Sequence, residues 1–229
     1  MPLILHIETA TDVCSVALAN KGVLIGVLQS SDARSHATQL TVLIDQLCKQ
    51  VGVELNQLNA VSVSKGPGSY TGLRIGVATA KGLCYGLDKP LISVNTLESY
   101  TSQLLAETPP DSLPLSGLIC PMVDARRMEV YNALFDQQKN WVRDTKAEII
   151  TASSFEDELK QHPIIFFGDG ASKCKEVLQP HSNSLFIDDF IPSATGQIEL
   201  AYNFYQKHQF EDIVYFEPFY LKEFVGFKS

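Results

Sequence analysis

The sequence predicts an α/β fold made of two similar halves in tandem. The first half reads as three strands followed by alternating helices and strands, an order typical of a mixed sheet covered by helices. A strand, a glycine turn and a helix over residues 59–86 form its clearest unit, and a strand, Gly168-Asp169-Gly170 and a helix echo that unit later. The three-proline segment 107–116 predicts domains of residues 1–106 and 107–229, with the C-terminal tail packing back on the first.

Short apolar runs and amphipathic stripes place the elements of the first half. Strands are predicted over residues 3–7, 14–19, 23–28, 59–64 and 91–94, and helices over 35–51, 71–86 and 97–105. Asn20-Lys21-Gly22 is typical of a hairpin turn. Ser35 is the expected cap of the first helix and Gly52 its expected stop.

The second half shows the same alternation more weakly. Strands are predicted over residues 118–123, 129–135, 141–145 and 164–167, and helices over 155–159, 171–178 and 194–208. Because strands again precede helices, the two halves favour a duplicated fold.

The glycine turn of the first half permits two interpretations. Gly66, Pro67 and Gly68 cannot continue the strand before them, and a hydroxyl of Ser69 or Thr71 can cap the helix that follows. Exposed N–H groups at a helix start also suit a phosphate. Since the P-loop pattern is absent, a structural turn is favoured over a phosphate cradle.

Small residues line one side of the helix after this turn, where Gly72, Gly76 and Ala80 are four apart. Each glycine inside a helix costs about 1 kcal/mol relative to alanine, so another element is expected to approach this side closely. That element is either the chain's own sheet or a partner, and the sequence leaves both open.

Composition and charge narrow the class of protein. A hydrophobic content of 45% and a charged content of 19% are typical of a folded chain. A net charge of −8 lacks the basic footprint of a protein that binds nucleic acid alone. Five widely spaced cysteines favour reduced thiols in the cytoplasm. The sequence predicts neither a signal peptide nor a membrane span.

Segments along most of the chain, in order, match a known family. They are ILHIETAT with CSVAL, SHATQL, SVSKGPGSYTGLRIGVATAKGL, VDARRMEVY and EPFYLK, and they resemble the TsaB (YeaZ) family. The resemblance implies a duplicated actin/Hsp70-like fold and a role in making threonylcarbamoyladenosine (t6A), the modified adenosine beside the anticodon of many tRNAs. It also implies a homodimer when alone, a TsaD-type transferase and a TsaE-type ATPase as partners, and contact with tRNA only through the complex.

The resemblance supplies a test of whether the chain is catalytic. TsaD-type relatives hold a metal ion through a His-x-x-x-His pair on the helix after the glycine block, where residues four apart share one face. Thr96 and Tyr100 stand at those positions here. The histidines form no ligand spacing, and a structural or exposed role is favoured for each: His6, His36, His162, His181 and His208. Neither a bound metal nor a catalytic residue is expected.

Tight nucleotide binding by the isolated chain is not expected either. Glu8 offers a carboxylate where actin-like ATPases have an acidic residue, but the turn after it contains no glycine to let a phosphate approach. The weak candidates for cofactor contacts are Glu8, Gly66, Gly68 and Ser69. ATP or ADP at an interface of the assembled complex stays open.

Two further groups of polar residues have a structural explanation beside a functional one. Capping accounts for Ser69 and Thr71, and no histidine near them in sequence could activate either hydroxyl. Asp124, Arg126 and Glu129 cluster in a turn and the strand after it. An ion pair that braces this turn is favoured over a ligand or partner contact.

The remaining candidate is a surface for another subunit. The first helix carries an apolar stripe and the next the small-residue ladder, so two such pairs could close as a four-helix seam. The predicted partner contacts are His36, Leu40, Leu43, Ile44, Leu47, Gly72, Arg74, Ile75, Gly76, Thr79 and Gly82. The sequence thus favours a non-catalytic scaffold and activator of a t6A-forming transferase. A small-molecule kinase or ATPase of the same fold is the first alternative, and a glycoprotease-like peptidase is the second.

Overall fold

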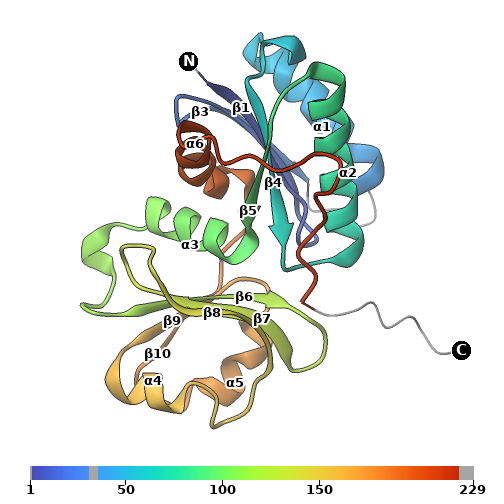
Figure 1. The fold of residues 1–229 in the computed structure, drawn as a ribbon. Helices are drawn as coiled ribbons and strands as arrows, with labels where there is room; N and C mark the ends of the chain where they lie inside the picture. Colours follow the sequence, from blue (N-terminus) through green and yellow to red (C-terminus); the bar gives the residue numbers. More distant parts are fainter. Residues whose placement is uncertain (1, 31–35, 222–229) are drawn as a thin grey trace, which may run out of the picture.

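Two five-stranded sheets divide the molecule into two lobes (Figure 1). The computed structural model describes residues 2–30 and 36–221. The first sheet contains β1 (Leu3–Glu8), β2 (Cys14–Asn20), β3 (Val23–Ser30), β4 (Ala60–Gly66) and β5 (Leu91–Asn95). The second contains β6 (Leu118–Asp124), β7 (Glu129–Phe135), β8 (Trp141–Ile149), β9 (Ile164–Phe167) and β10 (Ser184–Ile187).

The strand order confirms the predicted duplication. It is β3-β2-β1-β4-β5 in the first sheet and β8-β7-β6-β9-β10 in the second. In each sheet the central strand is antiparallel to the strand that follows it and parallel to its other neighbour. Both sheets are therefore mixed and share one topology, as expected of an actin-like fold.

Helices cover the faces of both sheets. They are α1 (His36–Val51), α2 (Tyr70–Leu87), α3 (Thr96–Glu107), α4 (Glu156–Gln161), α5 (Lys175–Leu178) and α6 (Ile198–Gln206). Short 3-10 turns are η2 (Leu55–Gln57), η3 (Pro110–Ser112), η4 (Ser172–Cys174) and η5 (Ala194–Gln197). Helix α3 follows the last strand of the first sheet but packs its apolar face on the second, so it joins the lobes (Figure 1).

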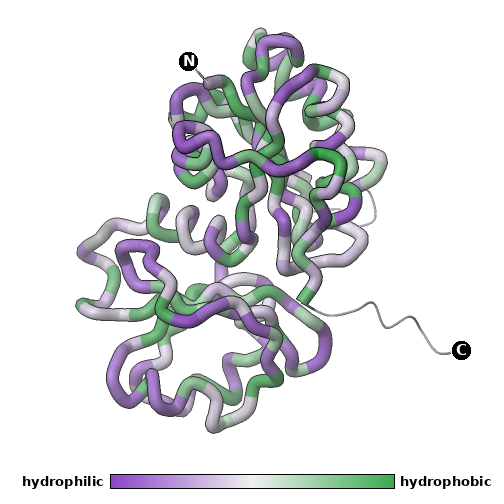
Figure 2. The backbone as a smooth tube through the Cα atoms, in the orientation of Figure 1, coloured by the Kyte–Doolittle hydropathy of each residue, from purple (hydrophilic) through white to green (hydrophobic). Residues whose placement is uncertain are grey.

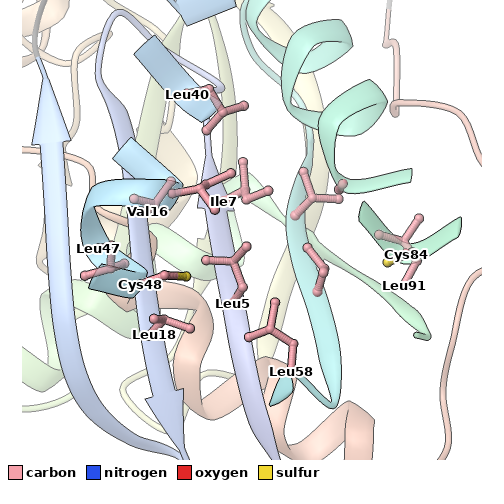
Figure 3. Close-up of a cluster of buried hydrophobic side chains, with 14 of the residues drawn as sticks. Leu5, Ile7, Val16, Leu18, Leu40, Leu47, Cys48, Leu58, Cys84 and Leu91 are labelled. Atoms are coloured by element: carbon pink, nitrogen blue, oxygen red, sulfur yellow. The ribbon is translucent and has the colours of Figure 1, made fainter. Parts of the chain in front are cut away.

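The main core lies between the first sheet and helices α1 and α2. Leu5 and Ile7 alternate with residues of the opposite face along β1, so both point into this cluster (Figure 3). Ile4 points to the other face, where it meets α6. Hydrophobic residues follow the central strands in both lobes, while hydrophilic ones gather on outer loops (Figure 2).

Local signals decided where α2 begins and ends. Ser69 is its N-cap, and the Ser69 hydroxyl accepts the N–H of Gly72. The helix runs one residue past Gly86 and ends at Leu87, and its C-cap Asp88 adopts the left-handed conformation. The expected cap of α1, Ser35, lies outside the described residues.

Two features of the structure differ from the prediction made from the sequence. Strand β10 was not predicted, because it has only four residues and a polar neighbourhood. The two sheets fall on either side of segment 107–116, but α6 packs on the first sheet through Leu200 and Ala201. The second half of the chain therefore contributes to both lobes.

All five cysteines are buried and free. None of the described helices combines the length and apolar character needed to cross a bilayer.

Candidate functional site

Glu8, the last residue of β1, is fully buried. One carboxylate oxygen accepts the N–H of Ala10 at 2.7 Å, and the other accepts the hydroxyl of Ser64. Burial raises the pKa of this carboxyl to about 7, although the bonds from Ser64 and Ala10 act in the opposite direction. The carboxyl group is therefore held inside the fold by internal donors.

The glycine turn packs against the turn that follows Glu8. The carbonyl oxygen of Ala10 accepts the N–H of Ser69 at 2.6 Å, and a Cβ on Gly68 would lie 2.3 Å from that same oxygen. Gly66 has a left-handed φ of +109°, and a Cβ there would lie 2.8 Å from the carbonyl oxygen of Phe219. The four candidates for cofactor contacts thus lie in one region, where close contacts within the chain explain the glycines.

Helix α3 brings Thr96 and Tyr100 to this region, and both are fully buried. The hydroxyls of Thr96 and Ser64 are 3.3 Å apart, which links the start of α3 to the end of β4. The ring of Tyr100 packs 5.4 Å from that of Phe190. The positions where TsaD-type relatives have a metal-binding histidine pair are therefore filled by a hydroxyl and an aromatic ring in tight packing.

Asp169 also belongs to this region, although the sequence predicted it only as part of a turn. It lies between Gly168 and Gly170 after β9, and burial raises its pKa to about 6, with Asp124 and Asp12 adding like charge. The pKa of Tyr100 is raised by burial and further by the charges of Glu8 and Asp169. Two carboxyl groups, one from each lobe, therefore influence the same phenol. The sequence feature that could have pointed to Asp169 is the Gly-Asp-Gly turn after a buried strand.

The histidines do not gather at a site. His6 is buried on β1, and burial lowers its pKa to about 3. His36 is buried at the start of α1, and Nε2 of His181 lies 2.9 Å from the carbonyl oxygen of Ala152. Within residues 2–30 and 36–221, no three His, Cys, Asp or Glu side chains are arranged to hold a metal ion.

The turn after β6 is braced by an ion pair, but its cation differs from the expected one. The carboxylate of Asp124 pairs with Lys173 at 2.8 Å, and the same ammonium donates to the carbonyl oxygen of Glu129 at 2.6 Å. Arg126 instead occupies a left-handed position in the turn, with φ of 72°. The structural interpretation of this cluster therefore stands with Lys173 in place of Arg126.

The structure corrects six of the predicted partner contacts. These residues are buried within the first lobe: His36, Leu40, Ile44, Leu47, Gly72 and Gly76. A Cβ on Gly72 would lie 2.1 Å from the carbonyl oxygen of Thr9, and one on Gly76 would lie 2.2 Å from its hydroxyl oxygen. The small-residue ladder therefore serves a contact within the chain, the alternative that the sequence left open.

The other five predicted partner contacts remain accessible. Leu43, Ile75 and Thr79 are half-buried, and Arg74 and Gly82 are exposed. The apolar stripe of α1 was misassigned because one stripe cannot face both its own sheet and a partner.

A second small-residue ladder lies on the opposite side of α2. We call this the outer face of α2, made up of the exposed residues Thr71, Arg74, Ala78, Gly82, Tyr85 and Gly86. Ala78, Gly82 and Gly86 are four apart, and a Cβ on either glycine would meet nothing within 4 Å. Tyr85 is 84% exposed beside them. The outer face is thus shallow and open to close approach.

Residues 209–221, which we call the C-terminal strap, cross from α6 to α2 (Figure 1). The ammonium of Lys81 donates to the carbonyl oxygens of Val214 at 3.2 Å and Phe216 at 2.9 Å. Nε of Arg74 donates to the hydroxyl of Tyr220 at 3.3 Å. The strap therefore borders the outer face of α2 and is fastened to the same helix.

Comparisons with known proteins agree on one group of relatives. A family model described as TsaD, tRNA N6-adenosine threonylcarbamoyltransferase, matches residues 16–224. The tRNA threonylcarbamoyladenosine biosynthesis protein TsaB of Haemophilus influenzae is 26% identical, with 99% of this chain and 96% of the relative covered. The TsaB protein of Buchnera aphidicola subsp. Acyrthosiphon pisum is 30% identical over 69% of each chain.

A solved structure shows the same fold. It is a Pseudomonas aeruginosa protein described as uncharacterized, with similarity to peptidase YEAZ. Its TM-score is 0.80 at 22% identity, and the match covers 97% of this chain and 100% of that one.

Proposed function

The chain belongs to the TsaB (YeaZ) family, within the wider TsaD-type family, and from this premise we propose that it is a non-catalytic subunit that binds and activates a TsaD-type transferase. Its relatives place it in t6A biosynthesis. The buried region around Glu8 and the outer face of α2 support the finer role.

The buried region around Glu8 supports a role without chemistry of its own. Thr96 and Tyr100 stand where TsaD-type relatives have a histidine pair, and the ring of Tyr100 is packed at 0% exposure. Glu8 is engaged by Ser64 and Ala10. With both of its oxygens accepting internal hydrogen bonds and its side chain at 0% exposure, Glu8 could reach a substrate only by giving up these contacts.

The outer face of α2 is the observation that carries the proposal. A glycine at an exposed position of a helix lowers the stability of the monomer and adds no packing contact within it. Gly82 and Gly86 have open space beside them, so neither is required by packing within the chain. Small side chains on an open helix face allow a partner helix to approach closely, which is where such glycines become useful.

The proposed partners share this face. A two-fold patch can pair with a second copy, and the same patch can pair with a TsaD-type transferase of related fold. Half-buried Leu43 and Ile75 would supply apolar contact beside the glycines. A TsaE-type ATPase would join the assembled pair, and tRNA would be held by the complex, since this chain carries a net charge of −8.

Reconstitution tests the proposal. A TsaD-type transferase and a TsaE-type ATPase are supplied with ATP, threonylcarbamoyl-adenylate and unmodified tRNA, and t6A is measured with and without this chain. We expect t6A only when the chain is present, and none from the chain alone. Equal t6A formation without it, or turnover by the isolated chain, would refute the proposal.

A further inference from the structure

A cavity of about 460 Å³ lies between the lobes, and neither the Glu8 region nor the outer face of α2 lines it. Its walls come from three distant parts of the chain. These are the ends of β4 and β5, the first half of β8, and the C-terminal strap, through Lys65, Asn95, Trp141, Asp144, Thr145 and Phe219. Small-molecule sites in proteins commonly have volumes of about 300–1,000 Å³ and lie between domains.

One aromatic wall of this cavity is held by a ring behind it, and the other is held through its backbone. The ring of Trp141 packs 4.4 Å from the buried ring of Phe135 and remains 39% exposed. The backbone N–H of Phe219 donates to the carbonyl oxygen of Lys65 at 2.6 Å, and its ring is 40% exposed. A flat ring that is fixed and partly exposed, as at Trp141, binds a planar ligand at low entropic cost.

Polar groups that line the cavity can still form an ion pair or a hydrogen bond with a ligand. Within the described parts of the chain, neither Lys65 nor Asp144 forms an ion pair. The Asn95 amide gives one hydrogen to Thr145 at 3.3 Å and has a second to donate. The cavity thus offers a cation, a carboxylate and an amide donor beside two rings.

We propose that this cavity binds a purine nucleoside 5′-monophosphate. The base would stack on Trp141 and Phe219, its N–H groups would donate to Asp144, and the phosphate would meet Lys65. Among the lining residues that the structure describes, Lys65 is the single cation and none is a glycine. One lysine matches one phosphate, whereas a triphosphate would bring excess charge to a chain of net charge −8. The proposal does not depend on the partner role of α2.

Fluorescence of the intact chain tests this site directly, because Trp141 is the chain's single tryptophan. AMP is titrated into the purified protein, and calorimetry checks the result against absorption by the base. We expect saturable quenching by AMP, with ATP and adenosine each binding about tenfold more weakly. Absence of saturation by AMP up to about 5 mM, or saturation by free phenylalanine instead of AMP, would overturn the proposal.

Matched variants separate the site from general effects. Phe219→Leu should weaken AMP binding about tenfold by removing a stacking surface. Phe210→Leu changes a comparably exposed ring of the same strap, at 38%, and should leave it unchanged. Lys65→Ala should weaken AMP binding until AMP binds only as tightly as adenosine does. An unchanged affinity for AMP in both Phe219→Leu and Lys65→Ala would also contradict the assignment, provided that circular dichroism shows them folded.

Discussion

The hydroxyl of Thr9 lies directly against Gly76: a Cβ on Gly76 would be 2.2 Å from Thr9 Oγ1. The same hydroxyl donates to the carbonyl oxygen of Gly72 at 2.8 Å. Through this contact the turn after β1 is fastened to α2, the helix that also carries the outer face. The two glycine ladders of α2 therefore have different roles, one inside the lobe and one on its surface.

Substitution of these glycines is expected to have opposite effects on stability. Gly76→Ala should lower the free energy of unfolding by about 1–3 kcal/mol, because the new methyl group overlaps the Thr9 hydroxyl. Gly82→Ala should raise it by about 0.5–1 kcal/mol, since alanine fits open space and favours a helix. Urea unfolding measures both. In the Thr9→Ala background the cost of Gly76→Ala should shrink, and an undiminished cost would argue against this contact.

The sequence was sufficient to predict most strands and helices and the order of the first lobe. Patterns of apolar residues determine these elements, as with Leu5 and Ile7 on β1. It could not decide which side of α2 faces its own sheet, because both sides carry small residues four apart. That choice depends on the turn at Thr9, a contact between segments more than sixty residues apart. Asp169 and Lys173 were missed for the same reason, since their roles depend on the distant residues Tyr100 and Asp124.

Burial of Glu8 should make stability depend on pH. Its pKa is about 7 in the folded chain against an ordinary value of 4.5, so the folded state binds the extra proton between these pH values. The stabilisation is complete below about pH 4.5 and is lost as the pH rises through 7, by about 3 kcal/mol at 1.4 kcal/mol per pH unit. Chemical unfolding of wild type and Glu8→Gln between pH 4.5 and 8 measures the difference.

The difference between the two proteins isolates Glu8 from the other groups whose pKa is shifted. Asp169 acts in the same direction, because its pKa is also raised. His6 acts in the opposite direction, since its pKa is lowered to about 3 and protonation from pH 6.5 downward favours unfolding. Both contributions are common to wild type and Glu8→Gln. Parallel pH profiles for the two would show that Glu8 is not the group responsible.

Association through the outer face of α2 should be blocked by bulk at Gly82. Gly82→Leu should weaken self-association and binding to a TsaD-type transferase by about tenfold or more, because a partner helix could no longer approach closely. The monomer should stay folded, since a side chain there meets open space. Sedimentation velocity measures both associations. Gly76 is unsuited to this test, because any change there disturbs the fold.

A change of similar size on the other lobe serves as the control for Gly82→Leu. Ala152 is exposed in the connection before α4, far in sequence from α2. Ala152→Leu should leave both associations at wild-type strength. Loss of association in both variants, or in neither, would rule out the outer face of α2 as the partner surface.

Lys81 should determine how firmly the C-terminal strap is held. Its ammonium donates to the carbonyl oxygens of Val214 and Phe216, and methionine keeps the aliphatic stem while removing both bonds. In Lys81→Met we expect faster hydrogen exchange and proteolysis within residues 209–221, with about 1–2 kcal/mol less protection. Lys49→Met, which removes only the exposed pair with Asp45, should leave the strap unchanged. Equal protection of the strap in both variants would mean that its apolar contacts through Ile213 and Phe216 hold it without Lys81.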